Sequence, residues 1–169
     1  MKWYTVDEEF LKGIRKYEPR IPKTDYGPDK FKPFFGALFE IGDLVYITQV
    51  SHAQARHSKI SENYDFIKLY DGKRLIAVVN LNYMFPVPRK KLIDVTYKNI
   101  QDFRTFVDEN ERSKYIAFLK KEMKQLKEKN VSDKAKRLYN LKYDYPDHEV
   151  SKRCIDFKDI EKKCREYDD

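Results

Sequence analysis

The stretch that decides the fold runs from Phe34 to His57, FFGALFEIGDLVYITQVSHAQARH. Residues 34–41 are nearly all apolar, which is typical of a central strand that is covered on both faces. Gly42-Asp43 fits a two-residue hairpin turn with glycine first, and residues 44–50 predict the returning strand. That strand leads into a short loop that holds two of the three histidines. We therefore expect a rigid sheet that presents a reactive edge directly after residue 50.

Other stretches predict the rest of the sheet. Together with the two above, strands are expected at 2–6, 34–41, 44–50, 64–70, 74–81 and 89–95. Asp71-Gly72 is the strongest short hairpin signal. Pro86 and Pro88 are expected to interrupt the strand pattern, and residues 89–95 to add a further edge strand. Asp7 is expected to cap a helix that Pro19 and Pro22 end, and Arg20 to Pro33 should form an irregular loop.

From residue 97 onward the apolar period becomes helical. Ile100, Phe103 and Val107 are expected to line the first helical face. Further stripes follow from Tyr115 and Ala135, and a last helix is expected over 156–167. Strands followed by helices predict an α+β fold, with a curved antiparallel sheet or partly open barrel against which the helices pack.

Length and composition favour one domain over residues 1–169, with a strand-rich part at 1–96 and a helical part at 97–169. No apolar run has the roughly 20 residues that a membrane helix needs, and no secretory signal precedes the first strand. Cys154 and Cys164 fit neither a disulfide framework nor a C-x-x-C metal pair. We expect reduced cysteines in a cytoplasmic protein.

The charge is concentrated in one region. The formal net charge is +7, and residues 112–137 alone contain ten Lys or Arg against three acids, which also gives +7. This run is either a solvated helix face or a footprint for nucleic-acid phosphates, whose binding would weaken steeply with salt. Composition leaves both interpretations open.

The residues around the reactive edge fit phosphodiester cleavage, with RNA as the substrate. Such a reaction needs a base, an acid and cations for the charge that grows on the phosphate. These residue types are present in Lys32, Ser51, His52, Arg56 and His57. The chain has no H-E-x-x-H motif, paired carboxylate cluster or glycine-rich phosphate loop, so we expect neither a metal nor a cofactor.

Three segments resemble a known family. KWYTV, PFFGALFEIGDLVYITQVS and LIAVVNLNYMFPVP resemble, in that order and at similar spacing, the ToxN and AbiQ family of type III toxin–antitoxin endoribonucleases. The resemblance covers residues 2–95 well and the helical remainder loosely. It implies a core like that of MazF and Kid with added helices.

The resemblance also implies an activity and a partner. Such toxins cut single-stranded RNA without a metal, and the ribose 2′-hydroxyl attacks the adjacent phosphate to leave a 2′,3′-cyclic phosphate. They process and are inhibited by a small repeated RNA pseudoknot, with which they close into cyclic assemblies. Their usual roles are phage defence and plasmid maintenance.

The family motif matches the chain in part. Lys32 matches the family lysine before the phenylalanine and glycine strand, and Ser51 matches the serine after the next strand. Where the family has threonine before this serine and proline then lysine after it, the chain has Val50, His52 and Ala53. We expect His52 to replace the missing lysine as acid or base, because histidine titrates near neutral pH.

The other candidate residues are expected to bind the phosphate and the rest of the RNA. Lys32 and Arg56 clamp the phosphate, Ser51 donates a hydrogen bond to it, and His57 lies nearby. RNA contacts are expected from Tyr26, Lys30, Lys59, Arg89, Lys90, Lys91, Lys114, Lys120, Lys121, Lys124 and Lys127.

Less specific explanations stay open. Lys32 can be an ordinary loop lysine, Arg56 part of a structural ion pair, Ser51 a helix N-cap, and His57 a solvated surface residue. Two other functions also remain. One is a non-catalytic RNA- or DNA-binding regulator that uses the basic helical region, and the other is a MazF-like toxin with a protein antitoxin.

Overall fold

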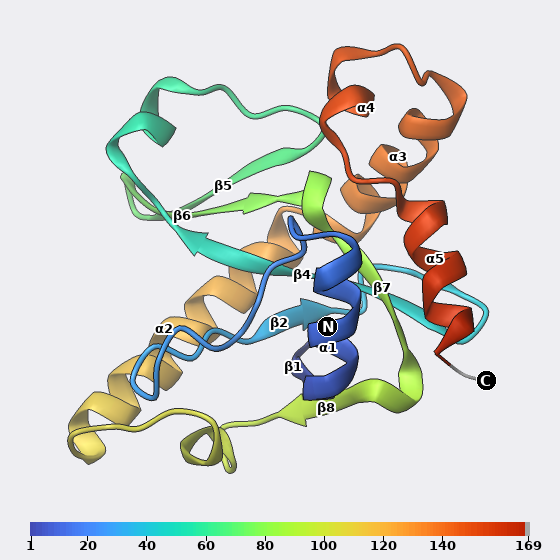
Figure 1. Ribbon diagram of the computed structural model, residues 1–169. Helices are drawn as coiled ribbons and strands as arrows, with labels where there is room; N and C mark the ends of the chain where they lie inside the picture. The colour runs from blue at the N-terminus through green and yellow to red at the C-terminus, as the bar shows by residue number, and fades with distance from the viewer. Residues whose placement is uncertain (168–169) are drawn as a thin grey trace.

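The computed structural model describes residues 1–167, so residues 168 and 169 of the expected domain lie outside it. The described chain is α+β (Figure 1). Its strands are β1 (Lys2–Val6), β2 (Phe34–Gly36), β3 (Glu40–Ile41), β4 (Leu44–His52), β5 (Phe66–Asp71), β6 (Arg74–Asn80), β7 (Phe85–Pro88) and β8 (Leu92–Val95). Its α-helices are α1 (Glu8–Tyr17), α2 (Glu109–Glu128), α3 (Val131–Asp144), α4 (Glu149–Arg153) and α5 (Phe157–Glu166).

The strands form one open antiparallel sheet with β4 at its centre. Its main order is β5-β6-β4-β2-β1-β8, and β3 and β7 also pair with β4. The first half of β4 pairs with β7, as in Leu44 opposite Pro88, and its second half pairs with β6, as in Val50 opposite Val79. The α+β class and the antiparallel sheet are therefore confirmed. Four other strands, β2, β3, β6 and β7, pair with β4. Its last residues, from Val50 to His52, pair with β6, so the sheet holds them in place.

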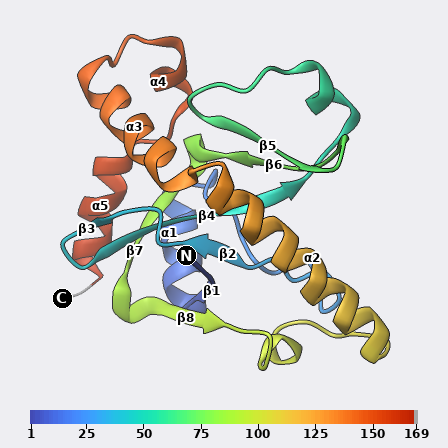
Figure 2. The same cartoon turned by 180° about the vertical axis from the view of Figure 1, so that it is seen from behind.

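Helices cover both faces of this sheet, which explains the apolar central strands. In Figure 1 α1 lies in front of the sheet and α2 behind it, and Figure 2 shows α2 from its own side. Phe34, Phe35, Tyr46 and Ile47 are fully buried as a result. Burial contributes about 1.5–3 kcal/mol for each such large apolar side chain.

Glycine is required at the end of β2, where this strand runs beside β4. A Cβ at Gly36 would lie 2.8 Å from Ile47 Cγ2 and 3.0 Å from the Tyr46 carbonyl oxygen. The expected strand 34–41 is interrupted just after this point. Leu38 N–H donates to the Tyr46 carbonyl, and Tyr46 N–H donates to the Phe39 carbonyl, so residues 37–39 curve around Tyr46 before β3 begins.

Two boundaries also differ from the expectation. The second hairpin turns at Gly72-Lys73, because Asp71 still pairs with Arg74 and Gly72 has a left-handed φ of 61°. Residues 89–91 form a short helical turn, so the edge strand begins at Leu92.

The prediction that Ile100, Phe103 and Val107 line one face of a helix was wrong. Only residues 100–102 form a helical turn, and Val107 is 89% exposed. The helix begins at Glu109, because the Asp108 side chain accepts the Glu111 N–H and caps it there. The stripes that start at Tyr115 and Ala135 are confirmed in α2 and α3, and the last helix is confirmed as α5.

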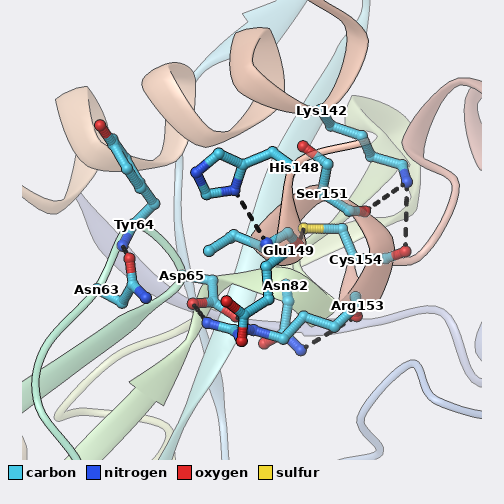
Figure 3. Close-up of polar contacts among 11 residues, drawn as sticks. Asn63, Tyr64, Asp65, Asn82, Lys142, His148, Glu149, Ser151, Arg153 and Cys154 are labelled. Carbon is cyan, nitrogen blue, oxygen red and sulfur yellow. Dashed lines mark hydrogen bonds and ion pairs between the residues drawn. The ribbon is translucent and has the colours of Figure 1, made fainter. Parts of the chain in front are cut away.

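The C-terminal helices are tied to the sheet by buried polar contacts. Arg153 Nε and Nη2 donate to the two oxygens of Asp65 at 2.6 and 2.7 Å, as Figure 3 shows. Next to this pair, Ile155 N–H donates to the Asn82 carbonyl at 3.1 Å. Cys154 and Cys164 are buried and are not joined in a disulfide, as expected, and burial raises the pKa of Cys154 to about 12. Within the described chain, no helix combines the length and the apolar character needed to cross a membrane.

Candidate active site

A pocket of about 110 Å³ lies between α2 and the end of β4. Its lining comes from β1, β4, α2 and the two loops that precede β2 and α2, and consists of Trp3, Lys32, Pro33, Val50, His52, Arg104, Tyr115, Phe118, Leu119 and Glu122. Two of the predicted catalytic residues, Lys32 and His52, therefore meet here.

His52 is exposed at the mouth of the pocket. Strand alternation places Val50 and His52 on the face of β4 that looks toward α2. The imidazole stacks on Phe118 with 6.1 Å between ring centroids. Partial burial, and then the positive charges of Lys32 and Arg104, lower the pKa of His52 below its usual 6.5. The ring is therefore neutral at pH 7 and able to accept a proton.

Lys32 is held in place through its own backbone. Its N–H donates to the Thr24 carbonyl, and its carbonyl accepts a hydrogen bond from Gln49 Nε2 at 3.0 Å. Gln49 also donates to the Lys23 carbonyl at 2.8 Å, so this side chain of β4 fixes the loop that carries Lys32. Sequence reasoning missed Gln49, although a polar residue in an apolar strand was a signal. The Lys32 Nζ lies 5.1 Å from the centre of the Tyr26 ring.

Sequence reasoning also missed Arg104. Its Nη1 donates to the Phe31 carbonyl at 2.8 Å, and its guanidinium carbon lies 4.1 Å from the centre of the Tyr115 ring. Its Nε is buried without a partner in the described chain. The anchored guanidinium lines the pocket and places a fixed positive charge there, which suits an anionic group.

Glu122 is the third residue that was missed. It lies on the buried stripe of α2 with Leu119, Met123 and Leu126, and it is 4% exposed. Burial raises the pKa of Glu122 to about 8, which the positive charge of Lys32 partly opposes. A carboxylate on the apolar stripe of a helix was the signal that could have found it.

The other predicted catalytic residues do not line this pocket. Ser51 belongs to the opposite face of β4 by strand alternation, and it is no helix N-cap, because the next helical turn is capped by Gln54. Arg56 is exposed on that turn and has no ion pair with a described residue. His57 is only 6% exposed, which contradicts the solvated alternative. Its Nδ1 accepts the Gln54 N–H, and burial lowers its pKa.

The predicted RNA contacts fall into separate groups. The exposed face of α2 carries Lys114, Lys120, Lys121, Lys124 and Lys127. Tyr26 and Lys30 belong to the loop before β2, and Lys59 ends the turn after β4. Arg89, Lys90 and Lys91 form the turn before β8, which lies away from α2 in both views (Figures 1 and 2).

Comparison with known proteins identifies the family. Residues 2–165 match the family described as toxin ToxN of type III toxin–antitoxin systems. The chain belongs to this family. An endoribonuclease ToxN from Bacillus thuringiensis subsp. kurstaki is 27% identical, over 98% of this chain and 84% of that protein. The resemblance found in the sequence is confirmed.

Solved structures share the ToxN fold over the whole chain. A type III toxin described as selectively inhibited by a non-coding RNA pseudoknot has a TM-score of 0.73 and 23% identity, with 99% of this chain and 98% of that chain covered. AbiQ, a lactococcal anti-phage endoribonuclease of the type III class, has a TM-score of 0.70 and 19% identity, with 99% and 97% covered. At these identities the likeness establishes the fold.

Proposed function

We propose that the protein is the endoribonuclease toxin of a type III toxin–antitoxin system and that it cuts single-stranded RNA beside the pocket at the end of β4. Membership of the ToxN family supports the reaction class. The observation that carries the assignment is the position of His52, a neutral imidazole at the mouth of a pocket that Lys32 and Arg104 also line.

The reaction is a transesterification without a metal. His52 takes the proton of the ribose 2′-hydroxyl, which attacks the adjacent phosphorus and gives a 2′,3′-cyclic phosphate. Lys32 and Arg104 stabilise the charge that develops on the phosphate oxygens. Arg56, which is exposed outside the pocket, contacts the RNA chain next to the cleaved bond, whereas Ser51 faces the other side of β4 and is assigned no contact with the reacting phosphate. We assign no proton transfer to His57, because its Nδ1 already accepts the Gln54 N–H.

We further propose that the partner is an RNA pseudoknot, which the toxin processes and with which it closes into a cyclic assembly. The relatives described above support this, as does the exposed lysine face of α2. In this proposal the sheet is a MazF- and Kid-like core with added helices, the chain acts as one domain in the cytoplasm, and its role is phage defence or plasmid maintenance.

Cleavage of single-stranded RNA in EDTA tests the reaction. We expect the purified protein to cut, and the products to carry cyclic phosphate ends. Strict dependence on added Mg²⁺ would contradict the mechanism. Salt-sensitive binding without any turnover would instead favour a non-catalytic RNA-binding regulator, for which the lysine face of α2 would suffice.

The nature of the antitoxin is tested separately. We expect tandem short repeats just upstream of the reading frame, and we expect a transcript of one repeat to inhibit cleavage. A small protein-coding gene in that place, whose product inhibits cleavage when the transcript does not, would support a MazF-like system with a protein antitoxin.

A further inference from the structure

We propose that Glu122 is the general acid of this cleavage, which gives a proton to the leaving 5′-oxygen while His52 takes one from the 2′-hydroxyl. This inference rests on the proposed endoribonuclease function and adds a catalytic residue to it. The two groups line the same small pocket from different elements, Glu122 from α2 and His52 from the end of β4.

Glu122 is unusual among the buried carboxylates because it has no partner. No hydrogen bond or ion pair joins its side chain to any described residue. Glu161, which is buried to a similar extent, accepts hydrogen bonds from Tyr46 at 2.6 Å and from Tyr139 at 2.8 Å. The Glu122 oxygens are not among the polar atoms that are closed off from solvent without a partner, so the carboxyl group meets the open space of the pocket. Glu161 is therefore a structural hydrogen-bond acceptor inside the fold, whereas the Glu122 carboxyl group lines the pocket without a protein partner.

Two N–H donors around the same pocket are also unsatisfied. Trp3 is 5% exposed, and its Nε1 has no partner among the described residues; the same holds for Nε of Arg104. Both residues line the pocket beside Glu122. Both nitrogens are closed off from solvent, so they show that the wall of the pocket is not fully hydrogen-bonded within the described chain.

The protonation states suit an acid and base pair. The groups that face Glu122 are Lys32 from the loop before β2, Arg104 from the loop before α2, His52 from β4 and Tyr115 from α2 itself. Burial in this setting raises the pKa of Glu122 to about 8, while the pKa of His52 is lowered. At neutral pH the carboxyl group is thus protonated and the imidazole is neutral. Opposite shifts in neighbouring groups are how acid and base roles are divided.

The proton and electron balance closes within the pocket. His52 accepts the 2′-hydroxyl proton as the bond between O2′ and phosphorus forms. The bond from phosphorus to O5′ breaks, its electron pair stays on O5′, and the Glu122 proton moves to that oxygen. The products are a cyclic phosphate, a free 5′-hydroxyl, an imidazolium and a carboxylate next to Lys32. Proton exchange with water restores the starting states.

An RNA with a sulfur leaving group distinguishes a general acid from a residue that is needed for folding or for RNA binding. We compare wild type, Glu122→Gln and His52→Ala on two RNAs, one ordinary and one with sulfur in place of the bridging 5′-oxygen at the cleaved bond. A thiolate leaves without being protonated, so it does not need a general acid. We expect Glu122→Gln to lose about 10²- to 10⁴-fold on the ordinary RNA and far less on the sulfur RNA. His52→Ala should lose rate on both.

The pH dependence gives a second readout. We expect Glu122→Gln to lose the alkaline limb of the kcat/KM profile near pH 8 and to keep the acidic limb. Glu9→Gln, which removes an exposed carboxylate on α1, serves as the matched control and should behave as wild type on both RNAs.

Three results would overturn the assignment. They are unchanged cleavage by Glu122→Gln, an equal loss on both RNAs, and a change of preferred sequence without a change of rate. Equal loss would indicate a structural role, and altered preference would indicate that Glu122 reads a base. In each case wild type would still cut ordinary RNA in EDTA, so the proposed function would stand. Failure of wild type to cut ordinary RNA would refute the proposed function itself.

Discussion

Glu122 makes the stability of the fold depend on pH. Burial raises its pKa to about 8, from 4.5 for an ordinary glutamate. Between these values the folded chain holds a proton that the unfolded chain has lost, so the free energy of unfolding falls as the pH rises. The fall is at most about 1.4 kcal/mol per pH unit.

Glu122→Gln should lack this dependence, because glutamine has nearly the same shape and does not titrate. We expect the variant to gain stability relative to wild type as the pH rises from about 5 to about 8. Thermal or denaturant unfolding of both proteins across that range measures the gain. A difference that is constant with pH would show that the folded carboxyl group titrates normally.

The titration of His52 should respond to its neighbours. Lys32 is one of the two charges that lower its pKa, after partial burial. Lys32→Met removes that charge and should raise the pKa of His52, which an NMR titration of its ring protons can measure without any RNA. Lys23→Met is the control, since the Lys23 Nζ lies 5.2 Å from the centre of the same Tyr26 ring but Lys23 does not line the pocket. An unchanged His52 titration in Lys32→Met would contradict the proximity of the two groups.

The sequence predicted part of this site for a physical reason. Lys32 and His52 could be found because they flank strands whose pattern is local. Arg104 and Glu122 come from the loop before α2 and from α2 itself, and only the packing of that helix across β4 brings them to His52. Ser51 and His52 are neighbours in the sequence, but successive side chains of a strand point to opposite faces of the sheet. Ser51 therefore lies on the face of β4 that is opposite to the pocket.

Among the elements, α2 joins the pocket to the charged surface. Its buried face holds Leu119, Met123 and Leu126, which the helical period predicted. The period failed just upstream, where Phe103 stacks on Phe31 from a loop and Val107 is exposed. The spacing of those residues matched a helix by coincidence, since periodicity cannot detect that Asp108 starts the helix later.

The exposed face of α2 predicts the salt dependence of RNA binding. Lys120, Lys124 and Lys127 project from this face, and each phosphate contact they make releases counterions. Replacing all three with Gln should lower the slope of log affinity against log salt by about one unit per lost contact.

The matched control for this experiment removes three exposed lysines of other helices, Lys16, Lys152 and Lys162. Binding of the antitoxin transcript is measured over a salt series for both triple variants. Equal loss of slope in the two would mean that net charge, rather than the α2 surface, determines the affinity.

At the scale of the whole molecule, polar contacts between residues far apart in the sequence join the helical half to the strand-rich half. Arg153 of α4 holds Asp65 just before β5, and Tyr46 of β4 donates to Glu161 of α5. Neither link was predicted, because 88 and 115 residues separate the partners along the chain. The apolar patterns predicted that the helices would cover the sheet. These two polar contacts help to determine the position at which α4 and α5 pack on it.

The Asp65 and Arg153 pair therefore tests whether the chain is one cooperative unit. Asp65 is 4% exposed, so Arg153→Met leaves a buried carboxylate without its cation and should cost about 2 kcal/mol, less than a fully buried pair because Arg153 is partly exposed. Lys152→Met, one residue earlier on the exposed side of α4, should cost little. We expect both variants to unfold in a single transition that far-UV and near-UV signals report alike, as one domain should. Two separate transitions in Arg153→Met, with the helical part lost first, would mean that the two halves are separate folding units that this ion pair holds together.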